Sequence, residues 1–239
     1  MSKGDGGGSG ARTLATRVRT ARKRSHASTL WLERQLNDPY VLRAKREGYR
    51  SRAAYKLIEM DERCRLFKPG QRIVDLGAAP GGWSQIAASR VKSAEGKGHV
   101  VAIDLLEMIA VPGIDFSVKD FNDADAPDFI KAKLNGLADG VISDMAANTT
   151  GHKATDHLRI VALAELAADF AAEILKAGGF FVAKVLQGGA EAELLARLKR
   201  EFATVRHVKP KASRADSAEL YVLATGFRGR RDADKSAAP

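Results

Sequence analysis

The sequence predicts an α/β protein with a doubly wound, mostly parallel sheet that ends in an antiparallel strand. Short apolar runs rich in β-branched residues alternate with longer segments of helical periodicity over most of the chain, and this alternation is typical of parallel sheets covered by helices. The last two apolar runs, near residues 203–208 and 220–225, have no helix between them. We therefore expect these two runs to close the sheet as an antiparallel pair.

Turn residues and apolar runs divide the chain into elements. Pro69-Gly70 makes a turn before the first clear strand, Arg72–Leu76, and a glycine-rich turn follows that strand. Gly178-Gly179 follows the longest helical segment, so we expect a glycine cap to end that helix. In order, the predicted elements are a helix at 52–65, a strand at 72–76, a helix at 83–93, strands at 99–104 and near 116–118, a helix at 125–134, a strand at 140–144, a helix at 153–176, a strand at 180–185, a helix at 189–202 and the two closing strands.

Three regions of different composition are expected. Residues 1–28 are rich in Gly, Ser, Thr and Arg/Lys with few apolar anchors, which predicts a disordered basic arm. Residues 29–228 form a single predicted domain, and residues 229–239 are interpreted as a flexible tail. The chain of 239 residues is long enough for one such domain with a complete hydrophobic core.

The positive charge is concentrated near the N-terminus. The first 56 residues contain fourteen Lys/Arg and four Asp/Glu, which accounts for the whole formal net charge of +10. A basic arm on a neutral body indicates a polyanionic partner, and the scarcity of apolar residues in the arm favours nucleic acid over lipid. The alternative is a solubilising tail without a specific target.

The composition argues against several other classes of protein. Cys64 is the only cysteine, so no intramolecular disulfide and no cysteine cluster for zinc is possible. The five histidines are scattered, and His152 and His157 have the wrong spacing to share a helix face, so no metal site is expected. No apolar stretch approaches the roughly 20 residues of a membrane span, and no secretory signal is evident. We therefore expect a cytoplasmic protein that is not bound to membranes.

The glycine-rich turn after the first strand, residues 75–83, is the first candidate ligand site. Glycines allow a sharp turn and a close approach to a ligand at the crevice where such sheets bind cofactors. The spacing is not that of a dinucleotide loop, Pro80 stands where such a loop presents amides, and no Gly-Lys-Ser/Thr follows for a phosphate loop. The turn therefore favours a nucleoside-like ligand without a pyrophosphate, and S-adenosylmethionine is the obvious candidate.

An aspartate stands at or just after the end of each of the next three strands, namely Asp104, Asp120 and Asp144. Asp104 is placed to accept hydrogen bonds from both ribose hydroxyls, Asp120 from an adenine amino group, and Asp144 would lie closest to the sulfonium. The alternative for each is an ordinary cap on the following turn or helix, which is common for aspartate. Three such residues beside one glycine-rich crevice favour the cofactor interpretation.

Four charged residues that are far apart in the chain stand in short distinctive motifs. Lys56 ends Ser-Arg-Ala-Ala-Tyr-Lys, Asp144 follows Ser143, Lys184 lies in Phe-Val-Ala-Lys-Val, and Glu219 begins Glu-Leu-Tyr-Val-Leu-Ala-Thr-Gly. A charge at the end of a buried strand is costly unless another group pairs with it. We therefore hypothesise that the four side chains meet in one functional site.

Together these motifs mark a resemblance. Residues 75–84 read DLGAAPGGWS, and with SDMA, FVAKV and ELYVLATG they closely resemble the FtsJ-type ribosomal RNA 2′-O-methyltransferases over residues 49–227. The resemblance implies a Rossmann-like S-adenosylmethionine-dependent methyltransferase fold, with a mostly parallel seven-stranded sheet and an antiparallel last strand. It places a catalytic tetrad on Lys56, Asp144, Lys184 and Glu219, and cofactor contacts on Gly81, Trp83, Asp104, Asp120 and Asp144. Ala147 departs from the family, which usually has Pro there.

The same resemblance implies a reaction and a substrate. The methyl of S-adenosylmethionine would pass to the ribose 2′-hydroxyl of a uridine in 23S ribosomal RNA, on the assembled 50S subunit. Lys184 is the candidate general base, or it stays charged and positions the hydroxyl oxygen. We expect a monomer that needs no metal.

Basic and aromatic side chains are candidates for holding the RNA. Phosphate contacts are expected from the basic arm and from Arg50, Arg52, Lys209, Lys211 and Arg214. Tyr55 or Tyr221 is the candidate for stacking on a splayed base. Three other functions compete: the same chemistry on tRNA, a noncatalytic RNA-binding assembly factor, and a nicotinamide-dependent oxidoreductase, which Pro80 disfavours.

Overall fold

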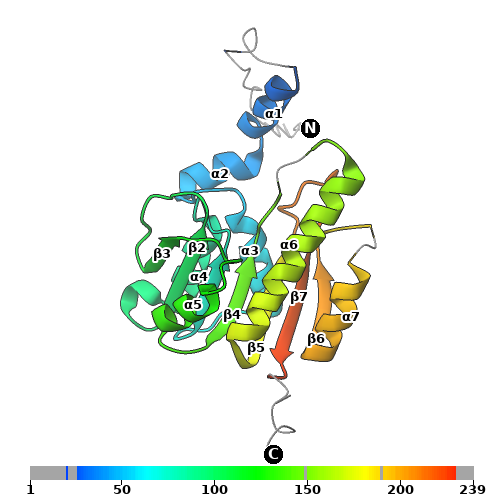
Figure 1. Cartoon of the computed structure of the whole chain (residues 1–239). Coiled ribbons are helices and arrows are strands. Elements are labelled where there is room, and N and C mark those ends of the chain that lie inside the picture. The colour runs from blue at the N-terminus through cyan, green and yellow to red at the C-terminus, as the bar shows by residue number, and fades with distance from the viewer. Residues whose placement is uncertain (1–19, 21–25, 148–149, 189–190, 230–239) are drawn as a thin grey trace, which may run out of the picture.

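Seven strands form a single sheet in the computed structural model, which describes residue 20 and residues 26–147, 150–188 and 191–229 (Figure 1). The strand order is β3-β2-β1-β4-β5-β7-β6. The strands are β1 (Arg72–Leu76), β2 (His99–Asp104), β3 (Ile114–Val118), β4 (Ala138–Ser143), β5 (Leu175–Leu186), β6 (Phe202–Val208) and β7 (Glu219–Phe227).

The predicted sheet is confirmed in both its parallel and its antiparallel part. β1 lies between β2 and β4 and is parallel to both, and β4 is parallel to β5. The last strand, β7, is inserted between β5 and β6 and is antiparallel to each. Because of this reversal, β7 begins at the edge of the sheet where the parallel strands end.

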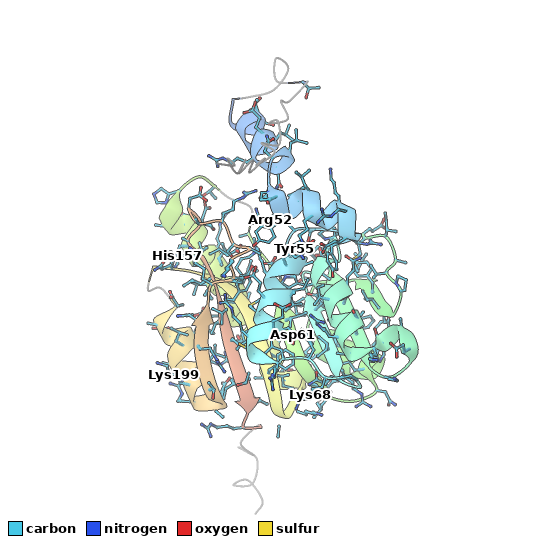
Figure 2. The ribbon with its side chains drawn as sticks, turned by 180° about the vertical axis from the view of Figure 1, so that it is seen from behind. Arg52, Tyr55, Asp61, Lys68, His157 and Lys199 are labelled. Atoms are coloured by element: carbon cyan, nitrogen blue, oxygen red, sulfur yellow. The ribbon has the colours of Figure 1, made fainter. Side chains whose placement is uncertain are left out.

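Helices cover both faces of the sheet. The helices of the described residues are α1 (His26–Leu36), α2 (Pro39–Glu47), α3 (Ala54–Cys64), α4 (Gly82–Val91), the short 3-10 helix η2 (Ser93–Glu95), α5 (Ala126–Leu134), α6 (Lys153–Ile174) and α7 (Ala192–Glu201). α5, α6 and α7 pack on the face seen in Figure 1, and α3 and α4 pack on the other, seen in Figure 2. Each face has its own core of fully buried side chains.

The junction between α6 and β5 differs from the expectation. The helix ends at Ile174 and the strand begins at the next residue, so Gly178-Gly179 lies inside β5 and does not cap the helix. Leu175 already has extended dihedral angles (φ −73°, ψ 138°) and pairs with Ala138 of β4. Pairing with the neighbouring strand therefore decides where this helix ends, and the glycine signal marks an irregularity within the strand.

The two predicted terminal regions lie largely outside the described residues. Of the proposed arm at residues 1–28, the structure describes residue 20 and the start of α1, which begins at His26. Of the proposed tail at 229–239, only residue 229 is described. None of the described helices has the length and apolar character needed to cross a bilayer. Over the same described residues, no group of three His, Cys, Asp or Glu is arranged to hold a metal.

The packing of α3 against the sheet generates a first prediction. Met60 of α3 is fully buried in the core shared with α4, whereas Glu62 on the same helix is exposed. Met60→Ala should lower the free energy of unfolding by about 2–5 kcal/mol, because it leaves a cavity. Glu62→Ala should change it by less than about 0.5 kcal/mol. Urea unfolding of both variants tests this, and equal effects would contradict the assignment of α3 to the core.

Candidate active site

The four nominated charged residues meet at the carboxyl edge of the parallel strands, although each comes from a different element. Lys56 lies on α3, Asp144 directly follows β4, Lys184 lies near the end of β5, and Glu219 is the first residue of β7. The antiparallel register sets Leu186 of β5 opposite Glu219. This reversal brings Glu219 to the edge that carries Asp144 and Lys184, and the hypothesis of one shared cluster is consistent with the structure.

The cluster, hereafter the Lys56–Asp144–Lys184–Glu219 tetrad, is held by direct ion pairs. Lys56 Nζ lies 2.8 Å from the Glu219 carboxylate and 3.7 Å from Asp144 Oδ2. Lys184 Nζ lies 2.7 Å from Asp144 Oδ1 and 3.9 Å from Glu219 Oε2, and it donates to the backbone carbonyl of Asp144 at 2.7 Å. The four side chains are between 9% and 17% exposed. Two positive and two negative charges therefore neutralise one another in a largely dry site.

Tyr221 is a fifth member of this cluster, although the sequence suggested that it stacks on an RNA base. Its side chain is fully buried, and its hydroxyl donates to Asp144 Oδ1 (2.7 Å) and accepts from Lys56 Nζ (2.9 Å). The ring packs against Trp83 at 5.5 Å between centroids. The expectation that Tyr221 or Tyr55 stacks on a base is wrong in this structure, because Tyr55 is buried as well. The signal that could have placed Tyr221 in the cluster is its position two residues after Glu219, on the same side of β7.

Ser213 is a contact of the tetrad that sequence reasoning missed. It is 6% exposed, and its Oγ donates to Glu219 Oε1 at 2.8 Å. It lies in the loop between β6 and β7, which the sequence showed only as a basic loop containing serines. No periodicity marks such a residue, because a loop side chain finds its partner only through the folding of the chain.

Burial and the neighbouring charges shift the pKa values of Asp144 and Tyr221 in opposite directions. Burial opposes ionisation of Asp144, but the charges of Lys184 and Lys56 and the hydrogen bonds to its carboxylate outweigh burial and lower its pKa. Burial, followed by the neighbouring carboxylates of Asp144 and Glu219, raises the pKa of Tyr221 well above its ordinary value. Asp144 is thus a carboxylate that accepts protons poorly, and Tyr221 is a neutral hydroxyl that donates to it.

A cavity of about 780 Å³ opens beside Asp144. The three strand-end aspartates of the sequence prediction, Asp104, Asp120 and Asp144, all line it, as does Ala147. Its apolar walls include Leu105, Leu106, Phe121, Met145, Leu163 and Leu166. A mostly apolar cleft with a few polar groups at its rim, at the carboxyl edge of a parallel sheet, is the usual form of a nucleotide or cofactor site.

Asp104 and Asp120 also make the capping contacts of the alternative interpretation. Asp104 accepts from the backbone N–H of Ala79 and of Leu106, both at 2.8 Å. Asp120 accepts from the backbone and side-chain amides of Asn122. Each carboxylate oxygen has further lone pairs, so these contacts fix the orientation of the side chains that line the cavity. The two interpretations are therefore compatible.

Gly81 and Trp83 lie apart from the other nominated cofactor residues. Neither lines the 780 Å³ cavity. Trp83 is 3% exposed and its indole N–H donates to the carbonyl of Ala53, which ties α4 to the start of α3. Gly81 has a φ of +107° and begins α4. From the same turn, Gly77 and Ala79 line the cavity instead.

The basic side chains nominated for RNA phosphates are largely occupied by protein acceptors. They are Arg50, Arg52, Lys209, Lys211 and Arg214. Arg52 donates to Asp38 and to the carbonyl of Ala212, and Arg214 lies 3.4 Å from the same Asp38. Lys209 donates to a backbone carbonyl of its own loop at 2.8 Å. Arg50 donates to two backbone carbonyls of the loop that follows β2.

The sheet with its inserted antiparallel β7, together with a nucleoside-sized cavity beside a charged cluster, defines a Rossmann-like methyltransferase. Residues 49–227 match the family described as FtsJ-like methyltransferase, and the chain belongs to that family. It is 67% identical over 222 residues to ribosomal RNA large subunit methyltransferase E of Azorhizobium caulinodans, covering 93% of this chain and 92% of that one. The protein of that name from Xanthobacter autotrophicus is 65% identical over 225 residues, covering 94% and 89%.

A solved structure supports the same fold. The crystal structure of a Plasmodium falciparum chain described as a ribosomal RNA methyltransferase is 30% identical, with a TM-score of 0.66. The match covers 76% of this chain and all of that one. The predicted methyltransferase fold and enzyme class are therefore confirmed.

Asp75 of β1 generates a prediction about pH. It is 1% exposed, and burial raises its pKa to about 7, helped by the charges of Asp144 and Asp104 and opposed by a hydrogen bond from Ser84. In the unfolded chain its pKa is about 3.9. The stabilisation from this raised pKa is present below the unfolded value and is lost as the pH rises through about 7.

Asp75→Asn should remove this dependence. Between pH 5 and pH 8, the free energy of unfolding of the unsubstituted protein should fall by about 2–3 kcal/mol more than that of the variant. Urea titrations of both proteins at the two pH values measure this difference. An identical change with pH in both proteins would show that Asp75 is already ionised at pH 5 in the folded state.

Proposed function

We propose that the chain transfers a methyl group from S-adenosylmethionine to the ribose 2′-hydroxyl of a uridine in 23S ribosomal RNA, on the assembled 50S subunit. The observation that carries the proposal is the Lys56–Asp144–Lys184–Glu219 tetrad at the wall of the 780 Å³ cavity. We further propose that the protein acts as a cytoplasmic monomer and that no metal takes part.

The residues of the cavity fit the proposed cofactor. Asp104 offers carboxylate lone pairs for ribose hydroxyls, Asp120 offers them for an adenine amino group, and the leucine and phenylalanine walls suit the apolar faces of a purine. A Cβ on Gly77 would lie 2.2 Å from Cγ of Met145, so glycine is needed where the turn after β1 approaches the loop after β4. When bound, S-adenosylmethionine supplies an electrophilic methyl on a positively charged sulfur.

The tetrad is suited to prepare a hydroxyl for in-line attack on that methyl. The hydroxyl oxygen must form its bond to carbon as the carbon–sulfur bond breaks, and its proton must leave to the protein. Lys184 Nζ is the proposed acceptor or, if it stays charged, the donor that positions the oxygen. Lys56 and Glu219 orient the ribose, and Asp144 holds Lys184 through two contacts. Orientation of this kind is worth of order 7–11 kcal/mol in good intramolecular cases.

The side of the tetrad away from the cofactor cavity supports an anionic substrate. Lys56 and Glu219 line a second hollow of about 290 Å³. Arg34, Arg52 and Arg214 line it together with Asp216, so basic side chains outnumber acidic ones there, although Arg52 and Arg214 also contact Asp38. Asp144 faces the cofactor cavity while Lys56 faces this basic hollow, so a ribose held between them would meet the methyl at the tetrad. The relatives named for large-subunit ribosomal RNA and the basic N-terminal quarter favour RNA as the occupant.

The proposed reaction predicts the behaviour of a Lys184 variant. Lys184→Ala should reduce methyl transfer at least on the order of a hundredfold, the range for loss of general acid–base catalysis. Its affinity for S-adenosylmethionine should stay within a few-fold, because Lys184 does not line the cofactor cavity. Labelled methyl transfer to 50S subunits, free ribosomal RNA and tRNA from cells lacking this gene, alongside calorimetric cofactor binding, measures both quantities.

Lys176→Ala is the matched control, because Lys176 lies on the same strand and pairs with Asp139 far from the tetrad. It should retain full activity. Labelling of tRNA alone would support the proposed methyl transfer but contradict ribosomal RNA as the substrate. Cofactor binding without labelling of any RNA would instead favour the noncatalytic assembly factor.

A separate prediction concerns the basic arm. Removal of residues 1–28 deletes seven Lys/Arg and one Asp, so it should weaken RNA binding and flatten its dependence on salt. Cofactor affinity should be unchanged. Binding isotherms at several salt concentrations test this, and equal salt slopes for the full-length and trimmed proteins would show that the arm makes no phosphate contacts.

A further inference from the structure

The loop after β2, residues 105–112, forms one wall of the cofactor cavity but has little packing of its own. Leu105 and Leu106 line the cavity and are 67% and 69% exposed, and Ile109 is 80% exposed. Apolar side chains this exposed do not hold a loop in place by burial. The position of this wall must therefore depend on other contacts.

Each end of the loop is anchored to the body. At its start, the backbone N–H of Leu106 donates to Asp104 Oδ1. Toward its end, Val111 is 8% exposed, and the backbone N–H of Ile114 donates to its carbonyl. The middle of the loop, residues 107–110, lacks these anchors.

Arg50 supplies the contacts in the middle. Its guanidinium donates from Nη1 to the carbonyl of Ile109 at 2.6 Å and from Nη2 to the carbonyl of Ala110 at 2.8 Å. Within the part of the chain that the structure describes, these are the only hydrogen bonds made by the backbone of residues 107–110. A planar guanidinium spans two consecutive carbonyls, which a lysine ammonium does not do with the same fixed geometry.

The backbone of Arg50 is itself fixed to α4, the helix that follows the glycine-rich turn. The side-chain amide of Gln85 on α4 accepts from the backbone N–H of Arg50 (2.9 Å) and donates to the carbonyl of Gly48 (3.1 Å). A Cβ on Gly81 would lie 3.3 Å from Cδ of Arg50 and 3.3 Å from Sδ of Met108. Glycine at 81 therefore leaves room for the arginine stem between α4 and the loop.

We propose that Arg50 is a positioning residue for the methyl-donor site, which latches the 105–112 loop in the place where Leu105 and Leu106 wall the cavity. The proposal rests on the proposed function for the identity of the ligand, but the latch is a property of the free protein. It assigns to Arg50 a role within the protein in place of the phosphate contact expected from sequence. The proposal also gives Gly81 a role, although Gly81 does not line the cavity: the absence of a side chain there leaves room for the side chain of Arg50.

Arg50→Ala and Arg50→Lys test the latch, with Arg46→Ala as the matched control. The side chain of Arg46, on neighbouring α2, is 78% exposed and lies 3.9 Å from the carboxylate of Glu47. NMR order parameters of the backbone amides in the free proteins report the mobility of the loop directly, and calorimetry reports the affinity for S-adenosylmethionine. Both Arg50 variants should lower the order parameters of residues 105–111 and weaken cofactor binding about tenfold, as expected for loss of charge-assisted hydrogen bonds. KM for the cofactor should rise while kcat changes little.

Unchanged order parameters in the loop of Arg50→Ala would overturn the latch, whatever the cofactor affinity. Reduced RNA affinity with a flatter salt dependence and unchanged cofactor binding would also overturn it and restore the phosphate contact. If the unsubstituted protein bound no S-adenosylmethionine, the proposed function would fail, and the comparison of order parameters would still decide whether the latch exists. Arg46→Ala should match the unsubstituted protein in every measurement.

Discussion

The mutual neutralisation of four charges with little access to water is the constraint on which the site depends. Two lysines and two carboxylates are each less than a fifth exposed, and loss of one partner would leave a buried charge at a cost of several kcal/mol. The ion pairs join α3, the end of β4, β5 and the start of β7. Tyr221 adds a hydroxyl between Lys56 and Asp144, so the cluster is connected as well as neutral.

Different members of the tetrad line two hollows of different character. Asp144 lines the larger one, whose walls are mostly apolar and which also carries Asp104 and Asp120. Lys56 and Glu219 line the smaller one together with arginines. A methyl donor on one side and an anionic acceptor on the other would meet at the side chains that must position and deprotonate the acceptor. This arrangement suits group transfer without a covalent intermediate, because the reaction needs alignment of two bound molecules.

Contacts that cap turns also shape the cofactor cavity. Asp104 holds the turn after β1 through Ala79 and the loop after β2 through Leu106. Arg50 and Gln85 connect that loop to α4, which begins at the same glycine-rich turn. The residues that would touch the cofactor are thus few, and a larger set fixes the backbone around them. Side chains held by such surrounding contacts keep a site within the tolerance that catalysis requires.

The sequence by itself determined the order of the main strands and helices from α3 to β7, the antiparallel end of the sheet and the membership of the tetrad, because period, turn residues and short motifs are local properties of the chain. The helices α1 and α2 were not predicted. Tertiary structure decided where α6 ends, because strand pairing at Leu175 overrode the glycine signal. It also decided the contacts of Tyr221, Ser213 and Arg50. Their partners lie between 6 and 165 residues away in the chain, and no local pattern specifies which distant group a side chain will meet.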